Sequence, residues 1–261
     1  YLALSHCWGG AKIIQLTRSS VDTFFQDIPL SSLPPTFIDA IKITNQLGYD
    51  YLWIDSLCII QDSFDDWKQE AAHMGSVYRN SALTIAALGA KGSYDGCYLD
   101  RQFKVPSLGQ PSPLHSRAWA VQERCLSTRT LNFNTNEISW DCIEAQAKEG
   151  QSWVPTNAHD SLKRRFYDIL NFATDGWRWR YHWIHDWWEF VEDYTSCDLT
   201  FATDRWPAFQ GLSTEIQRGR NKTLVHGLWL HRLVDELLWT VKQPANDQID
   251  MHEPSWSWLS T

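Results

Sequence analysis

Residues 33–88, LPPTFIDAIKITNQLGYDYLWIDSLCIIQDSFDDWKQEAAHMGSVYRNSALTIAAL, contain the pattern that decides the fold. Apolar residues repeat at helical spacing over 36–47, where Thr36 can cap a helix and Gly48 can end it. The apolar run 51–60 predicts a buried strand, residues 63–78 predict a second helix capped by Asp62 or Ser63, and residues 82–88 predict another strand. The stretch therefore predicts helix, strand, helix and strand in succession.

A further apolar strand opens the chain in YLALS, residues 1–5. Strands that alternate with helices form a largely parallel sheet, because parallel neighbours need crossover connections. We therefore expect an α/β fold with a partly parallel sheet flanked by helices. Such sheets bind ligands at the carboxyl ends of their strands, which places residues 5–10, SHCWGG, and residues 55–58, DSLC, at one edge. A strand at the first residue also suggests that the sequence is a piece of a longer chain.

The chain changes character after residue 90. Residues 91–114 are rich in Gly, Pro and Ser and predict a loop, residues 116–127 predict a short helix, and residues 129–142 predict a hairpin that turns at 134–136. Beyond residue 150 we expect helices around 160–172, 179–195, 204–218 and 229–239, while the closing EPSWSWLS alternates at strand period. Most of the 16 tryptophans lie in this part. We therefore divide the chain into an α/β domain, 1–148, and a helical, Trp-rich C-terminal region packed on it, 149–261.

Composition and charge argue against several classes of protein. The net charge is −8 and no basic stripe is present, so nucleic-acid binding is not expected. The short basic clusters at 163–165 and 178–180 are typical of solvated helix faces. No apolar run is long enough to predict a membrane span. The six cysteines form no C-x-x-C pair and no tight framework, which predicts reduced thiols and a cytoplasmic location.

Three blocks of sequence resemble a known family. LSHCWGG (4–10), the long block 33–88 and SRAWAVQERCLSTRTLNF (116–133) resemble, in this order, the heterokaryon incompatibility (HET) domain of filamentous fungi. Residues 187–213, WWEFVEDYTSCDLTFATDRWPAFQGLS, and the closing EPSWSWLS resemble segments that commonly follow that domain. The resemblance implies a role in non-self recognition and in a cell-death response.

The HET family is regarded as distantly related to Toll/interleukin-1 receptor (TIR) domains, some of which cleave the N-glycosidic bond of NAD with one glutamate. In those domains the glutamate follows a tryptophan in the pattern W-C-x-x-E. Residues 119–123 have this spacing, with Ala120 in place of the cysteine. The resemblance therefore implies a TIR-like fold, Glu123 as the catalytic carboxylate and NAD as the substrate, with no separate cofactor.

A carboxylate at Glu123 suits this chemistry, because cleavage of the nicotinamide–ribose bond passes through a cationic ribosyl state that a carboxylate stabilises. Trp119 lies four residues before Glu123, so on a helix both share a face and can present a ring and a carboxylate to one ligand. The competing interpretation is that Glu123 forms an ion pair with Arg117, Arg124 or Arg129.

The strand ends supply further candidate residues for binding the dinucleotide. Ser5 offers a hydroxyl and Trp8 an indole for stacking, while Gly9 and Gly10 would let the backbone approach a phosphate, although turn geometry explains the two glycines as well. Asp55 ends an apolar strand and either contacts the ligand or caps the next turn. The other candidates are Ser56, Gln61, Arg117 and Trp119, with capping of the following helix as the competing role of Gln61.

Cysteine and histidine patterns point to structural roles. Cys58 continues an apolar run, so a buried thiol is expected rather than a Cys/His nucleophile. His182 and His185, near Asp186 and Glu189, have the most metal-like spacing of the chain, but they lack H-E-x-x-H and tryptophans flank them. We expect a packed helix there and no metal site.

Two functions remain open from the sequence. In the first, the domain hydrolyses the nicotinamide–ribose bond of NAD through Glu123. In the second, it is a non-enzymatic signalling module that self-associates and passes a death signal to other proteins. A biosynthetic enzyme on the same scaffold, with an apolar pocket in the Trp-rich part, is a third interpretation.

Overall fold

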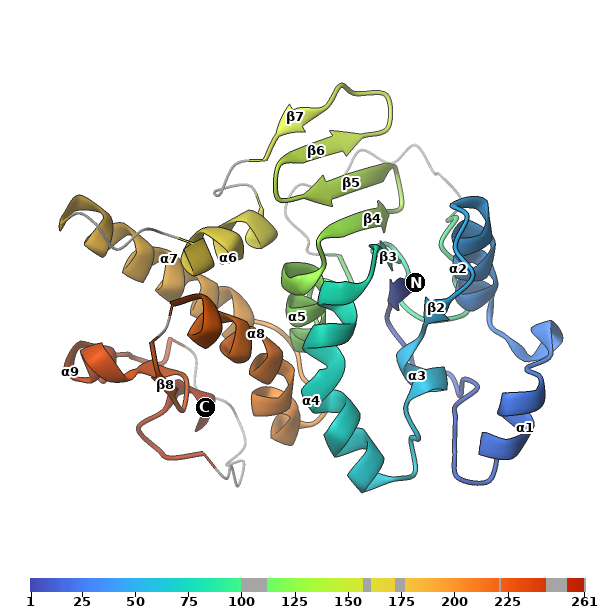
Figure 1. Cartoon of the computed structure of the whole chain (residues 1–261), viewed down its shortest axis with the longest axis horizontal. Coiled ribbons are helices and arrows are strands. Elements are labelled where there is room, and N and C mark those ends of the chain that lie inside the picture. Colours follow the sequence, from blue (N-terminus) through green and yellow to red (C-terminus); the bar gives the residue numbers. More distant parts are fainter. Residues whose placement is uncertain (100–111, 157–160, 172–176, 221, 243–252, 261) are drawn as a thin grey trace.

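The computed structural model describes residues 1–99, 112–156, 161–171, 177–220, 222–242 and 253–260. A seven-stranded sheet runs through it in the order β2-β1-β3-β4-β5-β6-β7 (Figure 1). Strands β2, β1, β3 and β4 are parallel, and the pairs from β4 to β7 are antiparallel. The predicted α/β fold with a partly parallel sheet is confirmed. The strands are β1 (Leu2–Ser5), β2 (Leu52–Trp53), β3 (Leu83–Ala86), β4 (Arg129–Phe133), β5 (Ile138–Cys142), β6 (Ala145–Lys148) and β7 (Val154–Pro155).

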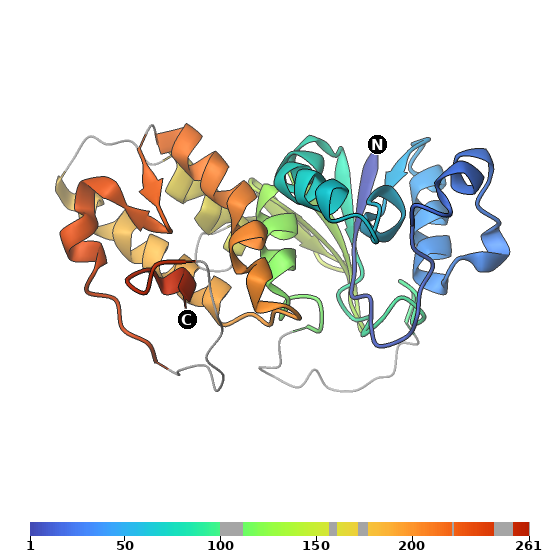
Figure 2. The ribbon, with the colours of Figure 1, turned by 90° about the horizontal axis from the view of Figure 1, so that it is seen from below.

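Helices cover both faces of the parallel strands, after the short helices α1 (Val21–Gln26) and η1 (Leu30–Ser32). Helix α2 (Pro35–Gln46) lies on one side of β1, and α4 (Phe64–Asn80) with α5 (Ala118–Leu126) lies on the other (Figure 2). Successive strand residues face opposite sides, so Leu2 and Leu4 share a core with Phe37 of α2, whereas Ala3 shares a core with Tyr78 of α4. Ser5 therefore faces the side on which α4 and α5 pack.

The starts of α2 and α4 differ in chemistry. Pro34 is the N-cap of α2 and Pro35 its first residue, where a missing N–H costs nothing and a fixed φ favours the helix. The predicted cap, Thr36, is wrong: its buried hydroxyl accepts a backbone hydrogen bond from a distant loop instead. The sequence offered Asp62 or Ser63 as the cap of α4, and Ser63 is the N-cap. Its hydroxyl accepts a hydrogen bond from Asp66 N at 3.4 Å.

The second predicted strand, over 51–60, is much shorter than expected. It contains only the two residues of β2, and the helical turn α3 (Asp55–Cys58) follows. The first residue of α3 accepts a hydrogen bond through Oδ1 from Ser56 N at 2.7 Å, a local bond that favours turns over strands. The carbonyl of Ser56 accepts a hydrogen bond from Leu16 N at 2.8 Å. This carbonyl is therefore bonded to a neighbouring loop and not to an adjacent strand of the sheet.

The short helix and the hairpin predicted for 116–142 are confirmed. They correspond to α5 and to the antiparallel pair β4–β5, in which Phe133 lies opposite Ile138 next to the turn. The sheet continues past residue 148 into β7, which pairs with β6. The division into 1–148 and 149–261 stays a prediction.

Three of the four helices expected in the C-terminal region are present: α6 (Leu162–Asn171), α7 (Trp177–Thr195) and α8 (Arg205–Arg220). The fourth, over 229–239, is wrong. The chain forms the hairpin β8 (Leu224–Val225) and β9 (Leu228–Trp229), followed by the short turns η3 (Leu230–Arg232) and α9 (Leu233–Glu236). His226 and Gly227 make the hairpin turn with φ values of 49° and 79°, the left-handed conformation of a two-residue β-turn.

The closing EPSWSWLS also differs from its strand-like period. It ends in the 3-10 turn η4 (Trp258–Ser260), in which Ser257 Oγ accepts a hydrogen bond from Leu259 N at 3.0 Å. The indole of Trp258 donates to Gly227 O at 2.9 Å. This bond and the one from Ser257 Oγ to His226 O at 2.6 Å fasten the segment to the β8–β9 hairpin by side chains rather than by a strand ladder.

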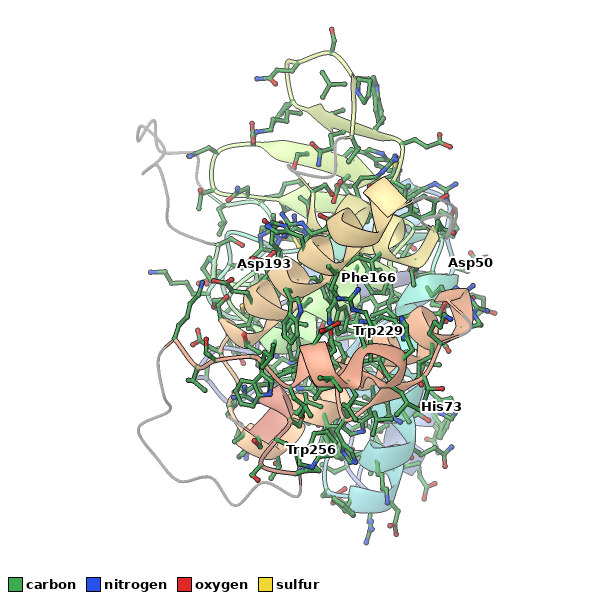
Figure 3. All side chains as sticks on the ribbon, turned by 90° about the vertical axis from the view of Figure 1, so that its left-hand side faces the viewer. Asp50, His73, Phe166, Asp193, Trp229 and Trp256 are labelled. Atoms are coloured by element: carbon green, nitrogen blue, oxygen red, sulfur yellow. The ribbon has the colours of Figure 1, made fainter. Side chains whose placement is uncertain are left out.

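The C-terminal region has a buried aromatic core, as the Trp-rich composition predicts. The rings of Trp187 and Trp229 meet edge to face with centroids 5.4 Å apart, and Trp229 and Phe166 lie among the packed side chains in Figure 3. This core is continuous with Ala3 of the sheet and with the inner faces of α4 and α5. Among the described residues, no helix is long and apolar enough to cross a membrane.

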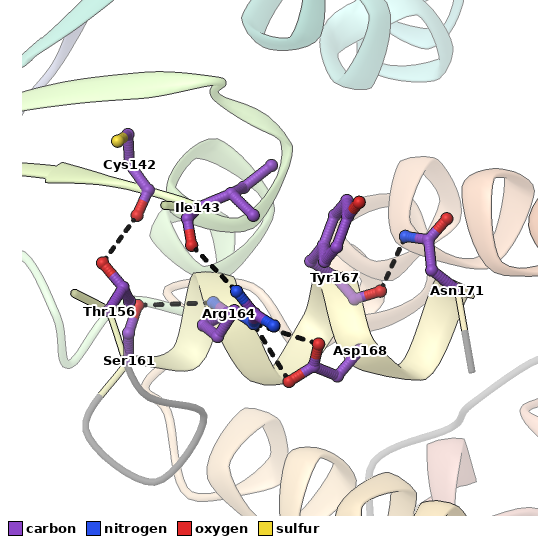
Figure 4. Close-up of polar contacts among 8 residues, drawn as sticks. All are labelled: Cys142, Ile143, Thr156, Ser161, Arg164, Tyr167, Asp168 and Asn171. Atoms are coloured by element: carbon purple, nitrogen blue, oxygen red, sulfur yellow. Dashed lines mark hydrogen bonds and ion pairs between the residues drawn. The ribbon is translucent and has the colours of Figure 1, made fainter. Parts of the chain in front are cut away.

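The basic stretch 163–165 is not the solvated face that the sequence predicts. Lys163 is 1% exposed, and its Nζ donates to Thr130 Oγ1 at 2.7 Å, because α6 packs against β4 and β5. Arg164 pairs with Asp168 at 3.0 Å and donates to the Ile143 carbonyl at 3.3 Å (Figure 4). These contacts join α6 to the antiparallel half of the sheet.

Candidate functional site

Glu123 and Ser5 meet in the interior although 118 residues separate them in the chain. Ser5 is the last residue of β1, and Glu123 lies on α5, which covers that face of the sheet. The Ser5 hydroxyl donates a hydrogen bond to Oε2 of Glu123. Both residues are nearly fully buried, at 4% and 3% exposure. Helix α5 therefore meets the carboxyl end of β1.

The surroundings of Glu123 set its protonation. Burial raises the pKa of this carboxyl to about 7, because the charged form loses its hydration. The positive charge of Arg117 and the hydrogen bond from Ser5 act in the opposite direction, and the charge of Asp55 adds to the rise. The hydroxyl of Tyr78, which donates to Leu4 O at 3.0 Å, also interacts with this carboxylate. Glu123 can therefore hold or release a proton near neutral pH.

Trp8 and Asp55 form a second pair at the same edge of the sheet. The indole Nε1 of Trp8 donates to Oδ2 of Asp55 at 2.8 Å, and the other carboxylate oxygen accepts from Ser56 N. Asp55 is the first residue of α3, after the N-cap Ile54, and its bond to Ser56 N lies within that turn. Contact of Asp55 with a ligand stays a prediction. Ser56 is completely buried, and its hydroxyl has no hydrogen-bond partner within the described part of the chain.

Among the described residues, no arginine forms an ion pair with the carboxylate of Glu123. Arg117 donates a hydrogen bond to the carbonyl of His6 and influences Glu123 only through its charge. Arg124 and Arg129 form no ion pair with Glu123 either. The alternative of a guanidinium locked on this carboxylate is therefore not realised.

Trp119 does not join this group of residues. Its indole donates to Oδ2 of Asp204 at 3.2 Å, and its ring packs against the aromatic core of the C-terminal region. Asp204 closes the 3-10 turn η2 (Ala202–Asp204) before α8. The spacing of four between Trp119 and Glu123 places both on α5, but the tryptophan is used to hold the C-terminal region.

Comparison with protein families identifies residues 1–108 as a match to the heterokaryon incompatibility protein (HET) family. The chain carries a HET domain. Comparisons with curated proteins and with solved structures found no significant match. The HET domain over residues 1–108 implies a role in heterokaryon incompatibility and cell death.

The family match covers only part of the candidate site. Ser5, Trp8, Asp55 and Tyr78 lie within residues 1–108, whereas Glu123 lies beyond them on α5. The site is therefore assembled from the matched segment and from a helix that the later part of the chain supplies.

The glycine pair of the HET domain has two different environments. Gly9 has φ +76°, and a Cβ at this position would lie 2.8 Å from the Cα of Gly92, so close backbone packing requires a glycine there. Gly10 is exposed and has no atom within 4 Å of an added Cβ. Gln61 neither caps α4 nor reaches the Ser5–Glu123 pair, since its amide donates to the carbonyls of Asp55 and Ile59 at 3.1 and 3.0 Å.

Tyr78 carries no sequence signal for a site, whereas the sequence suggests His6 only as the partner of a Cys/His nucleophile. Tyr78 belongs to the apolar stripe of α4, and only its hydroxyl distinguishes it from a core residue. His6 is 2% exposed, and neither ring nitrogen has a hydrogen-bond partner among the described residues. Burial lowers the pKa of His6 to about 4, so its ring is neutral at physiological pH.

The six cysteines are all free, as predicted. Cys58 is exposed, so the expectation of a buried thiol is wrong: the chain turns into α3 here instead of continuing an apolar strand. His185, Asp186 and Glu189 bring their ligand atoms within 4.8 Å of one another on α7, and the side chain of His182 lies outside the described residues. His185 is exposed while Asp186 and Glu189 are partly buried, and His185 pairs with Glu189 at 3.4 Å.

Proposed function

We propose that this HET domain hydrolyses the nicotinamide–ribose bond of NAD, with Glu123 as the carboxylate that stabilises the ribosyl cation. The observation that carries the proposal is the meeting of Glu123 with Ser5 at the carboxyl end of β1, next to the Trp8–Asp55 pair. A carboxylate without an ion pair is available for a cationic substrate, because no guanidinium has to be displaced.

The chemistry requires few groups. When the C1′–N bond breaks, the electron pair moves to the nicotinamide nitrogen and neutralises its charge, so the leaving group needs no acid. The negative charge of Glu123 stabilises the cation that remains on the ribose. A water oxygen then bonds to C1′, and Glu123 takes the proton of this water and passes it to solvent. A pKa of about 7 suits a group that takes and releases a proton near neutral pH.

The neighbouring residues have proposed roles that follow from their chemistry. Ser5 and Asp55 orient the ribose hydroxyls, and Trp8 stacks on the nicotinamide. Trp119 is not available for stacking, because its ring packs against the aromatic core of the C-terminal region. Since Ser5 and Glu123 are buried, substrate entry requires the segment 6–10, which Arg117 holds through the His6 carbonyl, to move away from the sheet edge.

Release of nicotinamide by the purified full chain tests this proposal. Glu123→Gln keeps the size of the side chain and removes its charge, so we expect a loss of about 100-fold or more in the rate. The matched control is Glu137→Gln, which removes a surface carboxylate paired with Lys148 on the β4–β5 hairpin and should leave the rate unchanged. The rate of the unchanged protein should rise with pH through about 7, as Glu123 ionises. Equal rates for Glu123→Gln and the unchanged chain in the same assembly state would contradict the proposal.

The burial of the pair supports a second candidate function, a non-enzymatic module that self-associates to trigger cell death. A carboxylate with 3% exposure reaches no ligand without a structural change. In this case Glu123→Gln keeps full toxicity in cells, and surface substitutions that abolish self-association remove it. Light scattering measures the self-association of the same variants. In this case toxicity follows self-association and does not follow the charge of Glu123.

A further inference from the structure

A small pocket lies between the sheet and α5, next to Ser5. Ala86 at the end of β3 and Ala120 on α5 line it, and their short side chains leave the space between strand and helix. Ser5 and Asn132 are the cross-strand neighbours of Ala86, so all three lie on one face of the sheet. The empty space including the open mouth is about 240 Å³, and its enclosed part holds about one water molecule.

The hydroxyls around this pocket leave one proton without an acceptor. Lys163 has only donors, so Thr130 Oγ1 must accept the bond from Lys163 Nζ and its own O–H remains free to donate. Ser127 uses its proton on the carbonyl of Glu123 at 2.6 Å, so Thr84 must donate in the 2.6 Å bond between Thr84 and Ser127. Of the two threonines that line the pocket, Thr130 is therefore the one with a free donor.

The charged groups of the pocket are cationic. Arg124 lines it, is half-buried, and forms no hydrogen bond or ion pair with another described residue. Lys163 stands behind Thr130 as a second cation. His115 also lines the pocket, and burial lowers its pKa to about 3, so the neutral ring offers one N–H. With the amide of Asn132, the pocket has a clear excess of hydrogen-bond donors over acceptors.

We propose that a phosphate group binds in the open mouth of this pocket, with Arg124, Thr130, Asn132 and His115 as donors, while the enclosed part holds only about one water molecule. The inference rests on the proposed function, because it places there the phosphate of the nicotinamide nucleotide half. In that half, one ribose ring separates the phosphate from the bond to be cleaved. A phosphate site must then be adjacent to the carboxylate and distinct from it. Ser5 meets this requirement, since it bonds Glu123 and also lines the pocket.

Calorimetric titration of the full chain at low ionic strength tests the pocket. The probes are inorganic phosphate, nicotinamide mononucleotide, and nicotinamide riboside, which has no phosphate. Arg124→Gln should weaken the binding of both phosphate-bearing probes by about tenfold or more and leave the riboside unaffected. The control Arg129→Gln removes an exposed guanidinium at the first residue of β4, outside the pocket lining, and should change none of the affinities. Asn132→Ala is a second variant with the same expected direction as Arg124→Gln.

The outcomes separate the pocket from the proposed reaction. If Arg124→Gln weakens mononucleotide binding while the unchanged chain releases no nicotinamide, the pocket stands and the proposed hydrolysis fails. Glu123→Gln should retain binding of inorganic phosphate, because Glu123 takes no part in the phosphate contacts. Equal affinities of the Arg124 and Arg129 variants, or binding of free phosphate without binding of the mononucleotide, would overturn the proposal.

Discussion

Glu123 is a carboxyl group whose burial links the candidate site to the stability of the protein. Its pKa is about 7 in the folded chain, against an ordinary value of 4.5. Between these values the folded state keeps a proton that the unfolded state has lost, so the free energy of unfolding falls as pH rises from about 4.5 to 7. Above pH 7, the free energy of unfolding is lower by about 3 kcal/mol than it is below pH 4.5.

Glu123→Gln should remove this loss, because an amide does not ionise. We expect the variant to unfold at about the same urea concentration as the unchanged chain at pH 5 and at a higher concentration at pH 8. Glu236, buried in the C-terminal region with a pKa that burial also raises to about 7, contributes equally to both proteins and cancels in the comparison. If the difference in urea midpoint between the variant and the unchanged chain is the same at pH 5 and pH 8, Glu123 does not titrate in this range.

Gly9 and Gly10 give a matched pair of substitutions in the loop after β1. Gly9→Ala forces a side chain into the left-handed region and brings its Cβ to 2.8 Å from Gly92 Cα, so we expect a loss of about 1–3 kcal/mol. Gly10→Ala adds a methyl group in open space and should change stability by less than about 0.5 kcal/mol. Urea unfolding measures both, and equal effects would refute the role of the Gly9–Gly92 contact.

At the scale of elements, the crossing of α4 and α8 depends on two glycines. A Cβ on Gly211 would lie 3.0 Å from the Cα of Gly75 and would strike the amide oxygen of Gln122, which accepts a hydrogen bond from Gly211 N at 2.8 Å. Gly211→Ala should therefore cost about 1–3 kcal/mol, although alanine is the better helix former. Gly219→Ala, on the same helix, meets Leu170 at 3.3 Å and should cost clearly less in thermal unfolding. A larger loss at 219 than at 211 would contradict this packing.

The elements that the sequence predicts well are those that local pattern determines. Alternating strands and helices predict the parallel half of the sheet, and Ser5, Trp8 and Asp55 follow from the rule that strand ends meet at one edge. The mistakes come from contacts between distant segments. The turn after β2 depends on the loop at Leu16, and the direction of Trp119 depends on Asp204 in a region 85 residues later.

The candidate site shows the same limit more sharply. The apolar stripe of its helix does not predict the contact that the Tyr78 hydroxyl makes. The sequence pattern predicts a surface charge at Lys163, which is buried because α6 packs against β4. Whether Glu123 is paired, solvated or buried depends on where Arg117 and Ser5 are placed, which spacing along the chain does not specify. Motif spacing therefore identified the helix, and only the tertiary structure identified its inward face.

At the scale of the whole molecule, the C-terminal region holds the helix that carries Glu123. The backbone of Asp198 bonds to the chain at the start of α5. Its carbonyl accepts from Ala118 N at 3.0 Å, and its N–H donates to Ser116 O at 2.6 Å. Asp204 bonds the indole of Trp119, and Gly211 bonds the side chain of Gln122. These contacts are spread along α5, so the position of Glu123 depends on residues far beyond the matched family segment.

Truncation after Lys148 should therefore prevent folding of the remaining α/β part. The inner faces of α4 and α5 would lose the aromatic core that covers Tyr78, Val121 and Leu126, and an apolar surface of this kind drives aggregation. We expect residues 1–148 alone to be insoluble or to unfold without a cooperative transition, by size-exclusion chromatography and circular dichroism. Co-expression with residues 149–261 should restore a soluble complex, because the contacts to α5 are non-covalent. A monomeric 1–148 fragment with a cooperative transition close to that of the full chain would show that the family domain folds by itself and that α5 keeps its place without the C-terminal region.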